Sequence, residues 1–529
     1  MHRILCCGAA CLLALLLTVR AEAQGRTVAG ETELDGTLEV QYEDFDGGAR
    51  LRHWLNTPTE RIELTFPGKP PEILAGNRVR AKGQLTNGAL ALSSEAAIVT
   101  LGLPIAPNTF GVQRTVVILI NFTNDASQPY TVETARTVAF TETNAFYQGN
   151  TYQQTSLAGD VLGWYTIPAS NTTCDTNTWA GLADQTANSY GVNVGSYARK
   201  VYAFPQTNAC NWWGLGSVGG NPSRAWINGE FAMRVLGHEL GHNFGSYHSH
   251  SQPCDATGCT IVEYGDDRDI MGGSTGHMTA AQKERLGWLN YGASPTIQTV
   301  TTAGNYWIES LERSGSGPKA LKILKSTNSS GYRTWYYVET RGGTVSGPKA
   351  GAGAAGVIIH TADEANANSS YQKDLQPSNT TWLSTLGAGQ TFADASLGLT
   401  ITTVSTDASG AIVDVTIGAT PPTVTPAPTN LVATPWNQSV SLTWTTVAGA
   451  TYDILRSTVA GGPYAVVAVG VQVSSYTDGA LTNGVTYYYV VQARTDAGQS
   501  TNSNQANATP TAPNVCGPKG CPSTPGGGK

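Results

Sequence analysis

Charged side chains are scarce in this chain of 529 residues, in which Asp, Glu, Lys and Arg together account for 13%. Soluble proteins usually carry about twice that share, roughly 25%. The 31 Lys and Arg are outnumbered by 38 Asp and Glu, so the net charge is −7. Nucleic acids select strongly basic surfaces, and anionic membranes select basic segments. The composition therefore argues against nucleic acid as a partner and gives no reason to expect a membrane surface.

Long apolar runs are missing after the N-terminus. The one run that stands out is Ile4 to Val19, which is shorter than the roughly 20 residues needed to span a bilayer. Arg3 precedes it, and Ala21-Glu22-Ala23 follows as a small-x-small cleavage site. This pattern predicts a secretory signal peptide over residues 1–23. We therefore expect a secreted, extracellular protein without membrane insertion; periplasmic and cell-surface proteins use the same kind of signal.

Cysteine is sparse, with nine residues in all, three of which fall in the predicted signal peptide. The remaining six include no Cys-x-x-Cys pair, which argues against zinc held by thiolates. An even number of cysteines in an exported chain is typical of disulfides. Proximity in the sequence favours Cys254–Cys259 and Cys516–Cys521, which leaves Cys174–Cys210.

Glycine and proline are abundant instead, with 60 and 26 residues, which indicates a turn-rich and largely β protein. Residues 31–100 alternate apolar and polar positions between turns and predict a small all-β module. A continuous apolar run at 114–122 predicts a strand buried on both faces. Helical spacing follows in four segments: 132–146, 178–190, 229–244 and 279–289. The last of these begins with a Thr-x-x-Gln capping box at Thr279.

The C-terminal third returns to the two-residue alternation of strands. Residues from about 296 to 417 predict a β-sandwich, and a stretch rich in Pro and Thr then predicts an extended linker. The segment that follows resembles a fibronectin type III module, on the stretches Val440-Ser-Leu-Thr-Trp444, Tyr452-Asp-Ile-Leu-Arg456 and Leu481-x-x-Gly-x-x-Tyr487-Tyr-Tyr-Val-Val-Gln-Ala493. The resemblance implies that Trp444 lies in the core and that the Tyr487 hydroxyl bonds to nearby backbone. It indicates a fold and not a ligand.

One stretch carries a pattern of metal chemistry, His238-Glu-Leu-Gly-His242-Asn-Phe-Gly245-Ser-Tyr-His248. The four-residue spacing places His238 and His242 one turn apart on one helix face, where both imidazoles can bind one metal ion. Gly245 can adopt a positive φ, so the helix can end there and the chain can turn back with His248. Three imidazoles leave a tetrahedral zinc ion with one open position for water, which Glu239 can reach.

A second motif, Asp269-Ile-Met271-Gly, follows this stretch. Together the two are similar to the metzincin signature of zinc endopeptidases, a His-Glu-x-x-His-x-x-Gly-x-x-His run followed by a Met-turn. Within the metzincins, the chain most resembles the gametolysin-type peptidases, on the stretches 237–245, 264–272 and 282–289. The resemblance implies an α+β catalytic domain with a mixed sheet, an active-site helix and Met271 as an apolar floor beneath the zinc site.

The same resemblance implies a reaction and its residues. His238, His242 and His248 would bind one catalytic Zn²⁺ ion, and Glu239 would act as the general base in hydrolysis of a protein or peptide substrate. An additional oxyanion donor cannot be assigned from the sequence. Proximity offers Tyr247, His250 and His277, and each of the three has a structural role as its alternative.

Other polar residues are interpreted more simply. His250 is expected to be a bystander of the metal site, and His53 and His360 are expected at the surface. The aspartates of the Met-turn stretch could bind Ca²⁺, or they could hold loop amides in a solvated turn; they are Asp266, Asp267 and Asp269.

The sequence therefore predicts a multidomain protein in which all-β modules flank the catalytic domain. The expected parts are a signal peptide (1–23), an N-terminal small β module (24–104), a metzincin-like zinc peptidase domain (105–292), a β-sandwich domain (293–418), a Pro/Thr linker (419–428), a fibronectin type III domain (429–510) and a flexible tail (511–529). The N-terminal module is either a propeptide or a retained accessory domain. No cysteine occurs between Gln24 and Cys174, so the module cannot block the zinc with a thiolate.

Two classes of function remain open at this point. The first is a secreted zinc endopeptidase that acts on extracellular proteins, with C-terminal β modules that contact a surface or polymer. The second is an adhesion or binding protein with a weak or inactive zinc site. A structural zinc site usually has four protein ligands, whereas the motif offers three and a well-placed glutamate, which favours catalysis.

Overall fold

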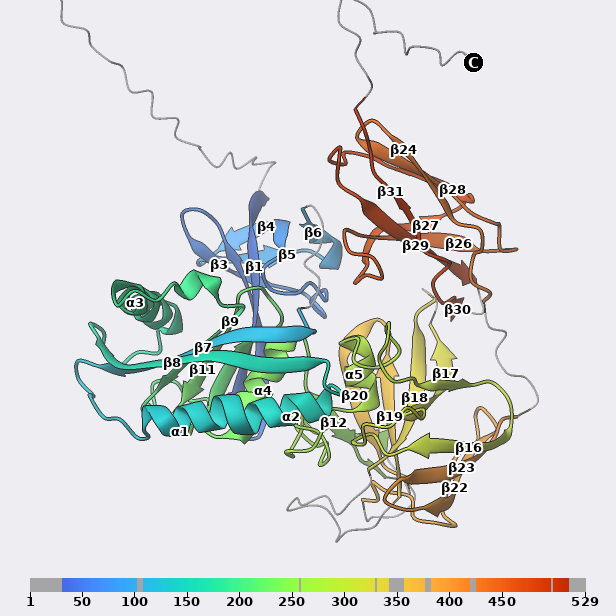
Figure 1. The fold of residues 1–529 in the computed structure, drawn as a ribbon, viewed down its shortest axis with the longest axis horizontal. Helices are drawn as coiled ribbons and strands as arrows, with labels where there is room; N and C mark the ends of the chain where they lie inside the picture. The colour runs from blue at the N-terminus through green and yellow to red at the C-terminus, as the bar shows by residue number, and fades with distance from the viewer. Residues whose placement is uncertain are drawn as a thin grey trace, which may run out of the picture.

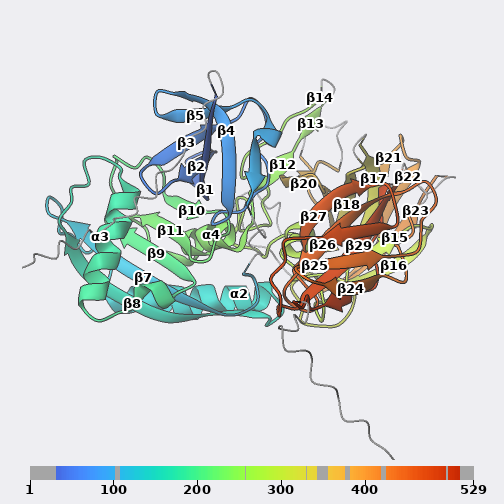
Figure 2. The ribbon, with the colours of Figure 1, turned by 90° about the horizontal axis from the view of Figure 1, so that it is seen from above.

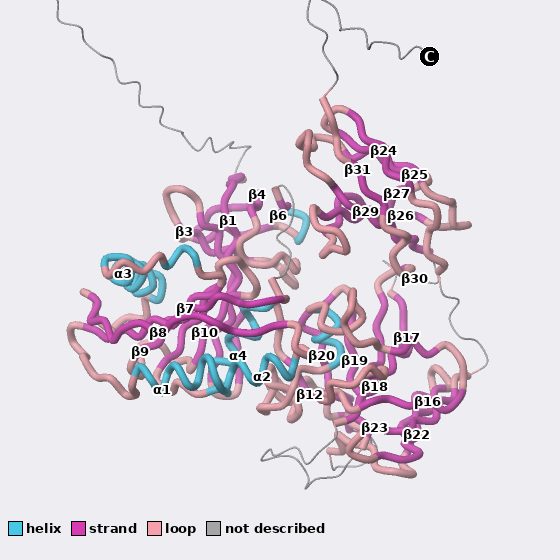
Figure 3. The backbone as a smooth tube through the Cα atoms, in the orientation of Figure 1, coloured by secondary structure: helices cyan, strands magenta, loops and turns pink. Residues whose placement is uncertain are grey.

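The computed structural model describes residues 31–101, 108–255, 258–328, 331–341, 356–375, 382–418, 425–495 and 498–512. The predicted signal peptide, the Cys516–Cys521 pair and most of the predicted tail lie outside these ranges. The protein is mostly β, with several sheets and few helices (Figure 1, Figure 3). No helix in the described ranges is both long and apolar enough to cross a membrane.

The N-terminal strands form a small barrel around their own core. Their hydrogen-bonded order is β4-β5-β3-β2-β1, and β1 also pairs with β4, which closes the ring. The strands are β1 (Thr32–Phe45), β2 (Gly48–Asn56), β3 (Arg61–Thr65), β4 (Arg78–Thr86), β5 (Ala89–Leu92) and the added edge strand β6 (Ile98–Thr100). Inward-facing side chains such as Val40, Leu55 and Val79 are fully buried, as the predicted alternation requires. His53 is also buried at 4% exposure, so its expected surface position is wrong.

The next segment forms the sheet that carries the helix with His238 and His242 (Figure 1, Figure 2). Four parallel strands lie in the order β11-β9-β7-β8, and β10 pairs with β11 in the antiparallel direction. Their bounds are β7 (Gly111–Phe122), β8 (Thr155–Ile167), β9 (Arg199–Phe204), β10 (Gly214–Ser217) and β11 (Ser223–Asn228). Through β10 this sheet is continuous with β1 of the barrel.

Strand β7 separates two cores, as its continuous apolar sequence predicts. Val117 and Leu119 face one core, together with α1 (Val132–Thr137), the π turn Val138–Thr143, α2 (Asn144–Asn150) and α4 (Met233–Phe244). Ile118 and Ile120 face the other core, which α3 (Thr176–Ser189) covers. Helix α4 starts four residues later than predicted, because Gly229 lies at φ 94°.

A β-sandwich follows and is joined to the preceding sheet elements. One of its sheets has the order β12-β20-β19-β18-β17-β15, and the other has the order β16-β23-β22-β21. The bounds are β12 (Ser249–Gln252), β15 (Gln298–Val300), β16 (Gly304–Glu309), β17 (Ala320–Thr327), β18 (Arg333–Thr340), β19 (Val357–Asp363), β20 (Asn366–Lys373), β21 (Thr391–Asp394), β22 (Leu399–Thr406) and β23 (Gly410–Thr416). Strand β12 begins directly after His248, so the third predicted ligand leads into the sandwich.

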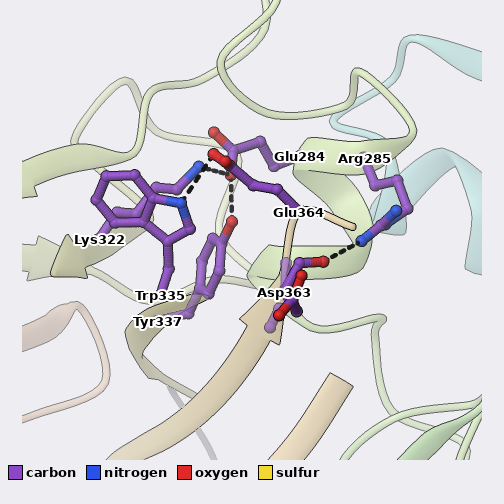
Figure 4. A pocket seen from close by; sticks show the side chains of 9 residues that line it. Glu284, Arg285, Lys322, Trp335, Tyr337, Asp363 and Glu364 are labelled. Atoms are coloured by element: carbon purple, nitrogen blue, oxygen red, sulfur yellow. Dashed lines mark hydrogen bonds and ion pairs between the residues drawn. The ribbon is translucent and has the colours of Figure 1, made fainter. Parts of the chain in front are cut away.

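Helix α5 (Ala280–Arg285) joins the peptidase segment to this sandwich. Thr279 caps it by accepting the Gln282 N–H, as the capping box predicts. A small surface pocket lies between α5 and the sandwich sheet, and polar bonds cross it from the helix to the sheet (Figure 4). Lys322 and the Tyr337 hydroxyl both donate to Glu284, at 2.8 and 2.6 Å. These bonds attach the helix to the sheet.

The C-terminal strands form a second sandwich. One sheet contains β24, β25 and β28, and the other contains β27, β26, β29 and β30, with β31 beside β29. The bounds are β24 (Val432–Trp436), β25 (Ser439–Thr443), β26 (Thr451–Ser457), β27 (Ala465–Val471), β28 (Ser475–Asp478), β29 (Tyr487–Thr495), β30 (Gly498–Gln499) and β31 (Ala506–Ala508). Trp444 lies in the shared core, and the Thr482 N–H donates to the Tyr487 hydroxyl at 3.1 Å. Both residues therefore take the positions that the fibronectin type III resemblance implies.

Two disulfides are present among the described residues, Cys174–Cys210 and Cys254–Cys259. Cys254–Cys259 is a pair that sequence proximity favours, and Cys174–Cys210 is the pair that this pairing leaves. Cys174–Cys210 connects the segment before α3 to the loop after β9, and Cys254–Cys259 joins the short strands β13 (Cys254–Asp255) and β14 (Gly258–Cys259).

Replacing both Cys174 and Cys210 with Ser should lower the free energy of unfolding by about 4 kcal/mol, because the bridge closes a long loop and restricts the unfolded chain. The separation is 36 residues for this pair and 5 for Cys254–Cys259. The same entropy argument gives about 2 kcal/mol for the shorter loop, so the matched double variant is the control. Urea denaturation of the two double variants measures the difference, and equal losses would contradict the loop argument.

Candidate metal centre

Helix α4 and the turn after it bring three imidazoles to one point. His238 and His242 lie one turn apart on α4, and Gly245 ends the helix at φ 109°. The chain then returns with His248, whose Nε2 lies 3.3 Å from the Nε2 of His238 and 3.1 Å from that of His242. All three side chains are fully buried. The predicted helix, turn and third histidine are thus brought together.

Each imidazole is held through its other ring nitrogen. Nδ1 of His238 donates to the carbonyl of Ile270 at 2.7 Å, and Nδ1 of His242 donates to the carbonyl of Ser246 at 2.9 Å. Nδ1 of His248 bonds to the carboxylate of Glu263. These bonds fix the rings with their Nε2 lone pairs toward the common point, as metal-binding histidines require.

The spacing of the three nitrogens fits a metal ion. Nitrogens bound to a tetrahedral ion at about 2.0 Å lie about 3.3 Å apart, since the tetrahedral edge is about 1.6 times the bond length. The observed separations of 3.3 and 3.1 Å agree with this value. Without a cation, three neutral nitrogen acceptors would face one another in a buried site, which is unfavourable. The donor set is therefore suited to an ion.

A fourth group lies at the same point, and the sequence did not reveal it. The carboxylate of Asp44, on β1, has Oδ1 3.0 Å from Nε2 of His248 and Oδ2 3.7 and 3.6 Å from Nε2 of His238 and His242. One ligand atom from each of the four residues lies within 4.8 Å of the others. The imidazoles hold the pKa of Asp44 well below its usual range, although its burial acts in the opposite direction.

Glu239 follows the first histidine and faces the same pocket. Its carboxylate lies against Gly214 and Gly216 of β10, where a β-carbon would collide with it. Neither of its oxygens has a hydrogen-bond partner among the described residues. Burial, and then the neighbouring carboxylate of Asp44, raise the pKa of Glu239 well above its usual value. Such a carboxylate is suited to accept a proton.

The Met-turn lies under the histidines. Met271 is fully buried, and its Sδ approaches Gly241 on the α4 helix so closely that a β-carbon there would collide with it. Asp269 holds the turn by accepting from the N–H groups of Met271 and Thr279, at 2.8 and 2.9 Å, and from the Ser249 hydroxyl at 2.7 Å. Burial raises the pKa of Asp269 to about 6.

The aspartates of this turn have protein partners. Asp266 bonds to Nε2 of His360 at 2.9 Å, and Asp267 accepts from Gln372 at 3.0 Å. All three are buried, so the expectation of a solvated turn is wrong, whereas their bonds to backbone and side chains match the predicted structural role. His360 is fully buried and not at the surface as expected.

The candidates for an oxyanion donor do not lie in the metal-binding group. Tyr247 packs edge-on against Tyr42, and His250 bonds to Asn368 at 3.0 Å. Tyr264 lies directly beside this group: its hydroxyl donates to Oδ1 of Asp44 at 2.6 Å, and its ring lies 4.4 Å from that of His248. Tyr264 and Glu263 directly precede the Met-turn stretch, which is the one sequence signal that could have found them.

The three fixed imidazoles and the Asp44 carboxylate form a group that could hold a metal ion, and the unpartnered carboxylate of Glu239 lies beside it. Residues 119–328 match the family model described as gametolysin peptidase M11, and this range includes the three histidines, Glu239 and Met271. This segment is therefore similar to the gametolysin-type metallopeptidases.

The other matches to known proteins cover short parts of the chain. Amylopullulanases from Thermoanaerobacterium thermosulfurigenes and Thermoanaerobacter thermohydrosulfuricus are 40% and 42% identical over 89 and 87 residues. Each match covers 16% of this chain, and the chain spans only 5% and 6% of those relatives. A solved Fn3-like protein from Clostridium thermocellum is 37% identical, with 16% of this chain and 91% of that chain covered, at a TM-score of 0.15.

Proposed function

We propose that the protein is a secreted zinc endopeptidase that hydrolyses peptide bonds in extracellular proteins. The observation that carries the proposal is the arrangement of three anchored Nε2 atoms, 3.1 and 3.3 Å apart, beside the free carboxylate of Glu239. Three neutral imidazoles in tetrahedral spacing are a typical donor set for catalytic zinc. A purely adhesive protein would have no need of a buried, unpartnered glutamate, which costs stability.

When bound, zinc would polarise the scissile carbonyl and lower the pKa of a bound water to about 7. Glu239 accepts the proton of the attacking water at a carboxylate oxygen and later delivers it to the leaving amine. Its position supports this role, because neither carboxylate oxygen has a hydrogen-bond partner among the described residues. While water attacks, the Tyr264 hydroxyl donates a hydrogen bond to the substrate carbonyl oxygen, from the position in which it now bonds Asp44.

The 105–292 segment is a metzincin-like domain, and the modules on either side keep their predicted boundaries. The C-terminal β modules hold the enzyme near a surface or polymer. Ca²⁺ is not needed for the turn at 266–269, whose carboxylates bind protein groups.

Metal analysis of the purified chain tests the proposal. We expect one zinc ion per folded chain, and loss of that ion in His242→Ala, because two imidazoles bind zinc far more weakly than three. His277→Gln is the matched control: its imidazole is half-buried, lies outside the metal-binding group, and should be dispensable for zinc. Casein hydrolysis, assayed before and after limited proteolysis, should depend on the bound ion. Folded wild-type protein that binds no zinc, even after zinc is added, would contradict the proposal.

A further inference from the structure

Strand β1 does more than complete the N-terminal barrel. Its last residues pair antiparallel with the outer edge of β10, with Gln41 opposite Ser217 and Asp44 opposite Gly214. The ladder continues at both ends, where the Val218 N–H donates to the Val40 carbonyl and the Trp213 N–H donates to the Asp44 carbonyl, at 2.9 and 3.0 Å. An extended peptide that adds to a sheet edge makes the same main-chain bonds. The barrel therefore occupies the edge beside the metal-binding helix.

Two side chains of β1 point from this edge into the metal centre. Tyr42 and Asp44 are two residues apart, so they lie on the same face of the strand. The buried Tyr42 ring stacks on that of His242 at 4.6 Å and lies 4.3 Å from that of His248. The Asp44 carboxylate fills the corner that the three imidazoles leave open.

We propose that the N-terminal barrel is an intramolecular inhibitor of the peptidase, in which Asp44 is the fourth ligand of the metal ion and β1 takes the place of an extended substrate. The inference rests on the proposed function for the presence of the ion. Release of the barrel exchanges the carboxylate for water at the ion and opens the edge of β10 to a peptide. Only the bond to the ion is exchanged, and no bond within the protein is broken.

The contacts of Asp44 support a ligand and not a packing role. Oδ1 accepts the Tyr264 hydroxyl at 2.6 Å, which orients the carboxylate. Oδ2 has no hydrogen-bond partner among the described residues, and it faces Nε2 of His238 and His242. The nearby guanidinium of Arg234 donates to the carbonyls of Ile270 and Gly272, at 3.0 and 2.7 Å. Asp44 and Glu239 are two carboxylates buried side by side. A cation between them and the imidazoles would compensate the cost of burying their charge.

Other contacts dock the barrel on the peptidase. The buried carboxylate of Glu39, on β1, pairs with the half-buried Arg224 of β11, and Glu72 pairs with Arg285 of α5 at 3.3 Å. The barrel core also includes Val218 of the peptidase segment. Inhibition by a carboxylate agrees with the lack of any cysteine between Gln24 and Cys174.

The coordination of Co²⁺ in the full chain tests the proposal directly. All variants carry Glu239→Gln, which prevents self-cleavage, and are loaded with Co²⁺ in place of zinc. Acetohydroxamate is titrated into the parent, Asp44→Ala and the control Asp46→Ala, whose exposed carboxylate lies in the next turn. We expect the visible cobalt spectrum of Asp44→Ala to respond at concentrations at least tenfold lower than in the parent and in Asp46→Ala.

The outcomes separate the two proposals. Equal titrations of Asp44→Ala and the parent would overturn the role of Asp44, whereas failure of every variant to bind Co²⁺ would overturn the metal site itself. Asp44→Asn, which keeps the shape of the side chain, repeats the titration if Asp44→Ala does not fold. With Glu239 restored, the uncut Asp44→Ala chain should hydrolyse a peptide substrate at least ten times faster than the uncut parent.

Discussion

Glu239→Gln should lower kcat for peptide hydrolysis by two to four orders of magnitude and leave one metal ion per chain in place. A positioned general base contributes about 10²- to 10⁴-fold, and the amide cannot accept the proton of the attacking water. The metal should be retained, because the three imidazoles are held by Ile270, Ser246 and Glu263 and not by Glu239. The measurement is casein or peptide hydrolysis after limited proteolysis, together with metal content.

The matched control for this experiment is Glu230→Gln, which removes an exposed carboxylate shortly before the same helix. Its activity should equal that of the wild type. Hydrolysis by Glu239→Gln at the wild-type rate would show that another group takes the proton. Loss of the metal along with activity would instead mean that the carboxylate helps to hold the ion.

Glu339→Ala should lower the free energy of unfolding by about 3 to 5 kcal/mol, because it removes the closest carboxylate of a buried guanidinium, whose remaining ion-pair partner is Glu312 at 3.5 Å. Arg341 donates to Oε1 of Glu339 through two nitrogens, at 3.1 and 2.7 Å, and both side chains are almost completely buried. Oε2 of Glu339 accepts the Ala280 N–H at the start of α5, at 2.7 Å. The substitution therefore breaks an ion pair and a bond between the peptidase segment and the sandwich.

Urea denaturation measures this loss, with Glu133→Ala as the control. Glu133 forms a surface pair with Arg136 and its side chain is 80% exposed, so its removal should leave the midpoint unchanged. If the urea midpoint of Glu339→Ala equals that of the control, the interface between α5 and the sandwich rearranges around the lost carboxylate without loss of stability.

Local patterns predicted the parts of the site that lie within one stretch of chain. The two histidines on α4, the turn at Gly245 and the third histidine follow from spacing along a helix and its end. Strand β7 and the cap at Thr279 were also predicted correctly. Burial on both faces gives a continuous apolar run, and a helix cap gives a Thr-x-x-Gln pattern, so both can be recognised within a short stretch of sequence. The relation to a family of peptidases came from the same residues.

The parts that the sequence did not predict depend on contacts between distant segments. Asp44 reaches the metal centre only because β1 pairs with β10, and nothing near Asp44 in the sequence specifies that partner. His53 and His360 were expected at the surface because polar side chains usually lie there. The buried imidazole of His360 instead has a hydrogen-bond partner in Asp266, which comes from another part of the chain.

The parallel pairing of β12 with β20 bears on how the smallest active enzyme is to be produced. Ser249, next to the third histidine, pairs with Ser370, so the strand that positions this ligand is supported from the sandwich. A fragment cut at residue 292 would leave that strand without its neighbour. The minimal recombinant unit should therefore extend to residue 418, and the sandwich counts as a structural part of the peptidase and not as an appendage.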